Sequence, residues 1–282
     1  MKRFMSEVRK QISLAPAWVV LLAWLAFSVA TVGWIFAASL STTREIFTYK
    51  LLNSGLHFEN FRSVLLKYNF ARYFYNSLIY ATVSGVGTIL IAAPAAYVIG
   101  RFDFPGRKFL TNNFLVAMSV PIIMLIIPLY GFMVRLKMIG SLGTLIIMYI
   151  VTSVPFTTYF LIGFFSSLPQ DLEDAAFMDG CSQYRAFWQI MFPLASPGVI
   201  TVGIFNFITV WNEYFMALIF ANTTETRTLA LGLWHTVQSM RYVGDWAGLF
   251  AAVVIVFLPT FIIYLLLSRK IIAGITGGAV KS

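Results

Sequence analysis

The sequence has few charges, one cysteine and two histidines. Charged residues make up 11% of its 282 residues and hydrophobic residues 59%, whereas a soluble domain has roughly 25% charged residues. Water is therefore not the main solvent of this chain. Cys181 is alone, so the chain has no internal disulfide and no CxxC site. His57 and His235 lie far apart, and we expect both to be solvated loop residues rather than metal ligands.

The sequence also lacks the common motifs of nucleotide-binding and hydrolytic sites. It contains no G-x-x-x-x-G-K-[ST], no H-E-x-x-H and no G-x-S-x-G. We therefore expect no catalysis, no metal and no cofactor in this chain. If it moves a solute uphill, another chain must bind the nucleotide. The net charge is +9, but the basic residues are scattered rather than gathered in a patch, which argues against nucleic-acid binding.

Long neutral windows separate the few charges. Six windows exceed the ~20 apolar residues that a spanning helix needs. They predict six transmembrane helices, at residues 17–40, 74–99, 109–134, 142–165, 194–220 and 247–267. The apolar runs are continuous rather than alternating, which argues against barrel strands. The first run is longer than a signal-peptide core of about 7–15 residues. The predicted fold class is an all-α membrane protein.

The distribution of lysine and arginine predicts the orientation of the chain. Six helices place both termini on one side, and that side holds eleven of the 20 basic residues. Five of the other nine lie in one long loop, residues 41–73. We therefore expect cytoplasmic termini, an extracytoplasmic loop at 41–73 and a cytoplasmic tail at 268–282.

Prolines and glycines mark local breaks in this pattern. Pro105-Gly106 predicts a tight turn, and the letters HFENF from His57 onward predict a turn into a short helix. Pro121, Pro128 and Pro155 lie inside predicted spans. Proline there frees backbone groups that neighbours or water must satisfy, which is compatible either with a polar interior or with kinked packing.

The most polar stretch holds four of the eleven acidic residues within nine positions. These are Asp171, Glu173, Asp174 and Asp179. Pro169 suits a first helical position, and acids near a helix N-terminus are favoured by its dipole. Gly180 suits the left-handed turn that ends a helix. The stretch thus predicts a helix–turn–helix that either docks in a groove of another protein or is a connector that contacts nothing.

Residues 173–197, EDAAFMDGCSQYRAFWQIMFPLASP, resemble the EAA loop of binding-protein-dependent ABC importer permeases. Eight residues are in register with that pattern: Ala175, Ala176, Asp179, Gly180, Phe187, Ile190, Pro193 and Pro197. Asp174 stands where the family usually has Glu, and Cys181 where it usually has Ala. Further segments, such as AAYVIGRFDFPGRK and IIAGITGGAVK, resemble the maltose-type sugar-importer subgroup from Asn60 to Lys281.

The resemblance implies a type I (MetI-like) permease fold, with residues 1–282 as one transmembrane domain in a bacterial or archaeal cytoplasmic membrane. It implies that residues 169–190 form a coupling loop seated in a cytosolic ATPase. The coupling residues carried over are Glu173, Asp174, Ala175, Ala176, Asp179, Gly180 and Phe187. The implied partners are a second, non-identical permease, two ABC ATPases that bind ATP and Mg²⁺, an extracytoplasmic solute-binding protein, the sugar and membrane lipid.

The function implied is half of the translocation path of an ATP-driven importer for di- or oligosaccharides. One alternative is an importer for another solute, such as a glycerol phosphoester or an acidic oligosaccharide. A secondary transporter or channel is an alternative of another class, which ion-driven transport without ATPase partners would favour.

Asn206, Thr209 and Glu213 lie at i, i+3 and i+7 and so share one face of the fifth predicted helix. We expect this face to line the sugar path, with Trp211 or Tyr214 packing on a pyranose ring. Alternatively, these polar groups bond to neighbouring helices. The glycine-containing tail is expected to be conformationally loose and to lie against the ATPases, or to be a frayed end.

Overall fold

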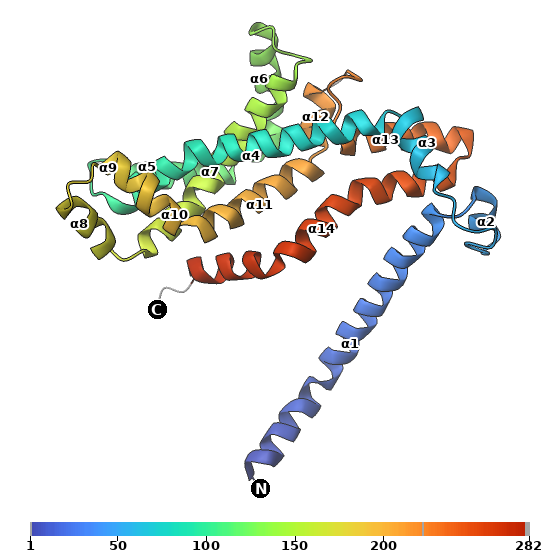
Figure 1. Ribbon diagram of the computed structural model, residues 1–282, viewed down its shortest axis with the longest axis horizontal. Coiled ribbons are helices and arrows are strands. Elements are labelled where there is room, and N and C mark those ends of the chain that lie inside the picture. Colours follow the sequence, from blue (N-terminus) through green and yellow to red (C-terminus); the bar gives the residue numbers. More distant parts are fainter. Residues whose placement is uncertain (1, 222, 280–282) are drawn as a thin grey trace. The chain divides into compact units, whose positions relative to one another are not determined.

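A computed structural model describes residues 2–221 and 223–279, and every regular element in these ranges is a helix (Figure 1). The elements are α1 (Lys2–Ser39), α2 (Thr43–Phe47), α3 (Glu59–Lys67), α4 (Phe70–Arg101), α5 (Arg107–Ser119), α6 (Ile122–Arg135), α7 (Leu142–Ser167), α8 (Asp171–Met178), α9 (Gln183–Ala186), the π-helix η1 (Phe187–Met191), α10 (Phe192–Leu194), α11 (Ser196–Asn212), α12 (Phe215–Phe220), α13 (Leu229–Val243) and α14 (Trp246–Ala279). The predicted all-α class is confirmed.

Within the described residues, four helical segments are long and apolar enough to cross a membrane. They are Pro16–Ser39, Phe70–Arg101, Leu142–Ser167 and Trp246–Ser268. Two further segments are bent pairs: α5 with α6, at 96°, and Gln183–Leu194 with α11, at 74°. The six predicted spans are reached when each bent pair counts as one span. The predictions of unbroken helices over 109–134 and 194–220 are wrong.

Pro121 explains the break between α5 and α6. Val120 and Pro121 both have extended backbone, with ψ values of 118° and 123°. Proline has no N–H to donate and disfavours helical geometry in the residue before it. Pro128 and Pro155 remain inside α6 and α7. Only one of the three prolines singled out in the sequence therefore ends a helix.

One further predicted boundary is wrong, and the end of the last span is confirmed. The fifth span ends at Asn212, and Glu213 has extended backbone before α12 begins. The last predicted span, 247–267, agrees with the candidate span Trp246–Ser268, but its helix, α14, continues beyond the span through Gly277 and Gly278 to Ala279. The expectation of a loose tail is therefore wrong for the described part, and residues 280–282 lie outside the described residues.

The chain forms two compact units. The first contains α1 to α3 and residues 236–255. In it, the Glu45 carboxylate closes a capping box with Thr42, and it accepts bonds from the Ser54 N–H at 2.6 Å and hydroxyl at 2.8 Å. These hydrogen bonds, first that from the Thr42 backbone, lower the pKa of Glu45 to about 2. The connection after α1 is thus an ordered segment.

Both histidines differ from the expectation of solvated loop residues. His57 does lie in a loop, but its ring bonds to Ser54 at 2.8 Å and to Glu59. The predicted turn into a short helix at this point is confirmed, because α3 begins at Glu59. His235 lies within α13, where burial lowers its pKa. Among the described residues, no group of three or more His, Cys, Asp or Glu side chains is placed to hold a metal ion.

The second unit contains residues 69–235 and residues from 256 onward. Its core is formed where α4, α7 and α11 run together (Figure 1). Small residues let these helices approach closely, as is common in membranes. A Cβ on Gly100 would lie 3.2 Å from the Ile162 carbonyl oxygen, and one on Gly198 would lie 2.5 Å from the Phe164 ring. The close packing of α4, α7 and α11 therefore requires glycine at positions 100 and 198, where a side chain would not fit.

We predict that Gly198→Ala destabilises the protein. The added methyl group would clash with Phe164, and overpacking of this kind costs about 1–3 kcal/mol. Thermal unfolding in detergent should show a lower midpoint. Gly163→Ala on α7 is the matched control, because nothing lies within 4 Å of the position that its new Cβ would take. Equal midpoints for the two variants would contradict the prediction.

Candidate functional site

The EAA-like loop forms a short helix, a left-handed turn and a second helical segment. Asp171, Glu173 and Asp174 lie in the first turn of α8, where the helix dipole favours negative charge. Gly180 has φ +76°, the left-handed conformation expected of it. The helix begins at Asp171 rather than at Pro169, so the predicted start is wrong by two residues. Ser182 caps α9, and the chain then enters the π-helix η1.

Three of the seven predicted coupling residues are buried against the rest of the second unit: Glu173, Ala176 and Phe187. Glu173 accepts a hydrogen bond from the Tyr97 hydroxyl at 2.5 Å and forms an ion pair with Arg101. The Phe187 ring packs 5.1 Å from the Tyr97 ring, measured between centroids. These residues attach the loop to the end of α4.

The other four predicted coupling residues, Asp174, Ala175, Asp179 and Gly180, are exposed. Met178, also on this segment, is 87% exposed, and Leu172 and Phe177 are partly exposed beside the acids. The outer face of α8 therefore combines acidic and apolar side chains, a composition that suits a protein partner more than water.

Sequence reasoning missed Tyr97 and Arg101, which hold the loop in place. They lie 76 and 72 residues before Glu173 in the chain. Nothing in the local pattern around Glu173 distinguishes it from its neighbour Asp174. In the sequence, Arg101 at the end of the second predicted span indicates only the orientation of the chain.

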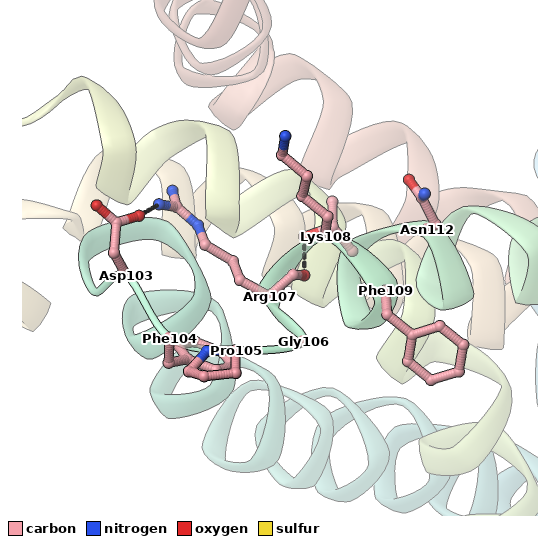
Figure 2. A pocket seen from close by; sticks show the side chains of 9 residues that line it. Asp103, Phe104, Pro105, Gly106, Arg107, Lys108, Phe109 and Asn112 are labelled. Atoms are coloured by element: carbon pink, nitrogen blue, oxygen red, sulfur yellow. Dashed lines mark hydrogen bonds and ion pairs between the residues drawn. The ribbon is translucent and has the colours of Figure 1, made fainter.

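The turn that follows α4 adjoins a hollow of about 810 Å³, lined by residues between Asp103 and Asn112 (Figure 2). The predicted tight turn is confirmed, with Gly106 at φ +93° and the Arg107 N–H donating to the Phe104 carbonyl at 3.2 Å. Figure 2 shows Arg107 reaching back to Asp103, whereas Lys108 points away from that pair. The acid of this turn is therefore neutralised locally.

The predicted path residues on α11 do not share one environment. Asn206 is buried, and its amide nitrogen donates to the Thr157 hydroxyl of α7 at 3.0 Å. Thr209 is exposed. Trp211 is 1% exposed, and its indole N–H donates to the Val256 carbonyl at 3.1 Å. For Asn206 and Trp211, the alternative of bonding to neighbouring helices is the arrangement observed.

Glu213 occupies the break between α11 and α12, so it is not on the helical face predicted for it. Its carboxylate accepts from the backbone N–H groups of Met216 and Ala217 at 2.7 and 3.1 Å, which satisfies the start of α12. The Tyr149 hydroxyl donates to the same carboxylate at 2.7 Å. The half-buried Tyr214 lies next to the partly exposed Trp234, with ring centroids 6.2 Å apart.

Among the described residues every regular element is a helix, and the surface helix α8 lies between two candidate spans. Residues 85–273 match the family described as "Binding-protein-dependent transport system inner membrane component", and the chain belongs to this family. It is therefore a multi-pass membrane protein and a permease subunit of the ABC importer class.

Characterised relatives support this membership. The chain is 31% identical to the diacetylchitobiose uptake system permease protein of Streptomyces coelicolor, over 93% of this chain and 87% of that protein. It is also 31% identical to the trehalose transport system permease protein of Mycobacterium tuberculosis, over 90% of this chain and 93% of that protein.

A solved structure supports the fold. The chain resembles a bacterial ABC transporter involved in the import of the acidic polysaccharide alginate, with a TM-score of 0.81 at 22% identity. The alignment covers 92% of this chain and 96% of that one. The predicted type I (MetI-like) permease fold is confirmed.

We predict that Glu213→Ala loosens the break between α11 and α12. The substitution removes the acceptor for two backbone N–H groups, and loss of such a cap costs about 0.5–2 kcal/mol. Hydrogen exchange of Met216 and Ala217 should accelerate. The control is Asn212→Ala, which removes only an amide bonded to the Ile208 carbonyl of its own helix. Equal exchange in wild type and Glu213→Ala would contradict the capping role.

Proposed function

We propose that this chain is the permease subunit of an ATP-driven carbohydrate importer. It forms half of the translocation path and pairs with a second, non-identical permease. Two ABC ATPases bind ATP and Mg²⁺, and an extracytoplasmic binding protein delivers the sugar. The family and the two relatives named for disaccharide transport support this assignment, because full-length similarity at this level extends over the whole membrane region.

The observation that carries the energy-coupling proposal is the two-sided character of α8. Its inner side is fixed by Glu173 and Ala176, whereas its outer side exposes Asp174, Asp179 and Met178. A short helix with an anchored base and an exposed, partly apolar face fits a groove of a partner protein. The sequence contains no phosphate-binding loop of its own, so ATP-driven motion would enter through this contact.

The orientation follows from the same proposal. If α8 contacts a cytosolic ATPase, the turn after α4 and both termini also face the cytoplasm, since these segments lie at the same ends of the predicted spans. The basic residues Arg101, Arg107 and Lys108 then lie on the cytoplasmic side, as the positive-inside rule requires. The loop at 41–73 faces outside.

The proposed sugar contacts lie around the break after α11. Thr209 is exposed, whereas Tyr214 and the Glu213 carboxylate, which accepts from Tyr149, are half-buried. Hydroxyl and carboxylate groups suit sugar hydroxyls as hydrogen-bond partners, and the part of an aromatic ring that is exposed suits the apolar face of a pyranose. Asn206 and Trp211 do not line this region, but their bonds to Thr157 and Val256 hold α11 against the neighbouring helices.

Gly180→Val is expected to uncouple ATP hydrolysis from transport. A β-branched residue is strained at φ +76°, and strain of about 1–3 kcal/mol at this turn should lower transport by about tenfold. The measurements are the amount of ATPase subunit that stays bound to the purified complex, and ATP hydrolysis and sugar uptake in proteoliposomes. Gly106→Val places the same strain at φ +93° in the other turn, outside the docking face. Equal losses in both variants would indicate general strain rather than docking.

Thiol labelling tests the path. In a Cys181→Ser background, Thr209→Cys and Tyr214→Cys should react with water-soluble reagents in at least one transport state, and a transported sugar should slow the reaction. Val202→Cys, at a fully buried position of α11, is the unreactive control. If positions 209 and 214 never react in any state, the proposed path is wrong.

A further inference from the structure

The Glu173 carboxylate lies at the centre of a buried polar cluster. Its side chain is 6% exposed and that of Arg101 is 9% exposed. One carboxylate oxygen accepts from the Tyr97 hydroxyl at 2.5 Å, and the other accepts from the Arg101 guanidinium. A buried charge is costly unless it is paired and hydrogen-bonded, and here both oxygens have partners. We call Glu173, Tyr97 and Arg101 the clamp.

The clamp joins segments that lie 72 and 76 residues apart in the chain. Tyr97 and Arg101 lie in the last turns of α4, and Glu173 lies in the first turn of α8. Arg101 also donates to the Leu168 carbonyl at 2.9 Å, at the end of α7. One guanidinium therefore fixes both the docking helix and the segment that leads into it.

The last turns of α4 are themselves tightly packed. Gly100 approaches α7 so closely that the Ser166 hydroxyl donates to the Gly100 carbonyl at 3.1 Å. The Phe187 ring, which follows the turn at Gly180, packs on both Tyr97 and Phe165. Both ends of the docking loop are thus attached to one place, the end of α4 where it meets α7.

Asp174 differs from Glu173 in its exposure to solvent. It is the acid next to Glu173 in the chain, but it is exposed. Because successive residues of a helix point about 100° apart, one acid turns inward to the clamp and the other outward. The two adjacent acids therefore have different surroundings: Glu173 meets its own chain, and Asp174 meets whatever covers α8.

We propose that the clamp is a positioning device that makes α8 and α4 move as one rigid body. Glu173 then takes part in coupling by transmitting displacement of α8 to the membrane helices, not by contacting the ATPase. This inference rests on the proposed docking of α8 to an ATPase. It gives Glu173 a different role from the docking residues with which the family resemblance groups it.

The experiment measures whether α8 keeps its place on α4. Spin labels are placed at position 171 on α8 and at position 75 on α4, both exposed, in a Cys181→Ser background of the complete transporter complex. The span along α4 from position 75 to Arg101 is about 40 Å at 1.5 Å per residue, within the range of pulsed electron resonance. The distance distribution is recorded without nucleotide and with ATP and vanadate.

In the wild-type complex we expect one narrow distribution that nucleotide does not change. In Glu173→Gln the ratio of narrow to broad component should fall by about tenfold, on the scale of coupling between linked sites. Asp174→Asn is the matched control and should keep the narrow distribution. A wild-type distance that changes with nucleotide, or a Glu173→Gln distribution identical to wild type, would overturn the proposal.

Glu173→Gln leaves Arg101 without its carboxylate partner, and the complex can then fail to assemble. A second variant keeps the proposal testable in that case. Glu173→Leu with Arg101→Met removes both charges and should assemble with the broad distribution.

The amount of ATPase subunit that stays bound to the complex distinguishes the docking proposal from the clamp proposal. If Met178→Asp and Gly180→Val both retain the ATPases as wild type does, the docking proposal is wrong. If those variants lose the ATPases while Glu173→Gln keeps the narrow distribution, only the clamp is wrong.

Discussion

Backbone N–H and C=O groups find no water in the hydrocarbon of a membrane, so each must be bonded within the protein. This constraint explains why the described residues are helical, and it governs the places where helices stop. At the end of α11 the Glu213 carboxylate accepts from the N–H groups of Met216 and Ala217. A side chain thus takes the place of a backbone acceptor where the helix stops.

The helices α4, α7 and α11 are held by close backbone approach as well as by buried apolar side chains. Gly100, Gly198 and the alanines of α4 let α4, α7 and α11 pack together, and polar pairs such as Asn206–Thr157 add interhelical hydrogen bonds. In lipid, packing and hydrogen bonding of this kind replace the hydrophobic effect as the force between helices. The loop at 169–190 is attached to this packed α4–α7 pair.

The two sides of the loop at 169–190 have different surroundings. Residues that face inward, chiefly Glu173 and Phe187, attach it to Tyr97 on α4. Residues that face outward, including Asp174 and Met178, remain open to a partner. An element that docks to a partner and transmits its motion needs both properties, because a displacement is passed on only when the contacts on both sides are firm.

The sequence alone predicted the membrane environment, the all-α class, the four unbroken spans and the left-handed turn at Gly180, because charge spacing and glycine geometry are local properties. Through its resemblance to a family it also predicted a docking role for the loop at 169–190. It could not distinguish Glu173 from Asp174, place Trp211 in the core, or predict that a span ends before Glu213. Those outcomes depend on Arg101, Val256 and Tyr149, which lie 72, 45 and 64 residues away. Only tertiary packing decides which side chain of a helix meets a neighbour, because that choice depends on contacts between segments distant in the chain.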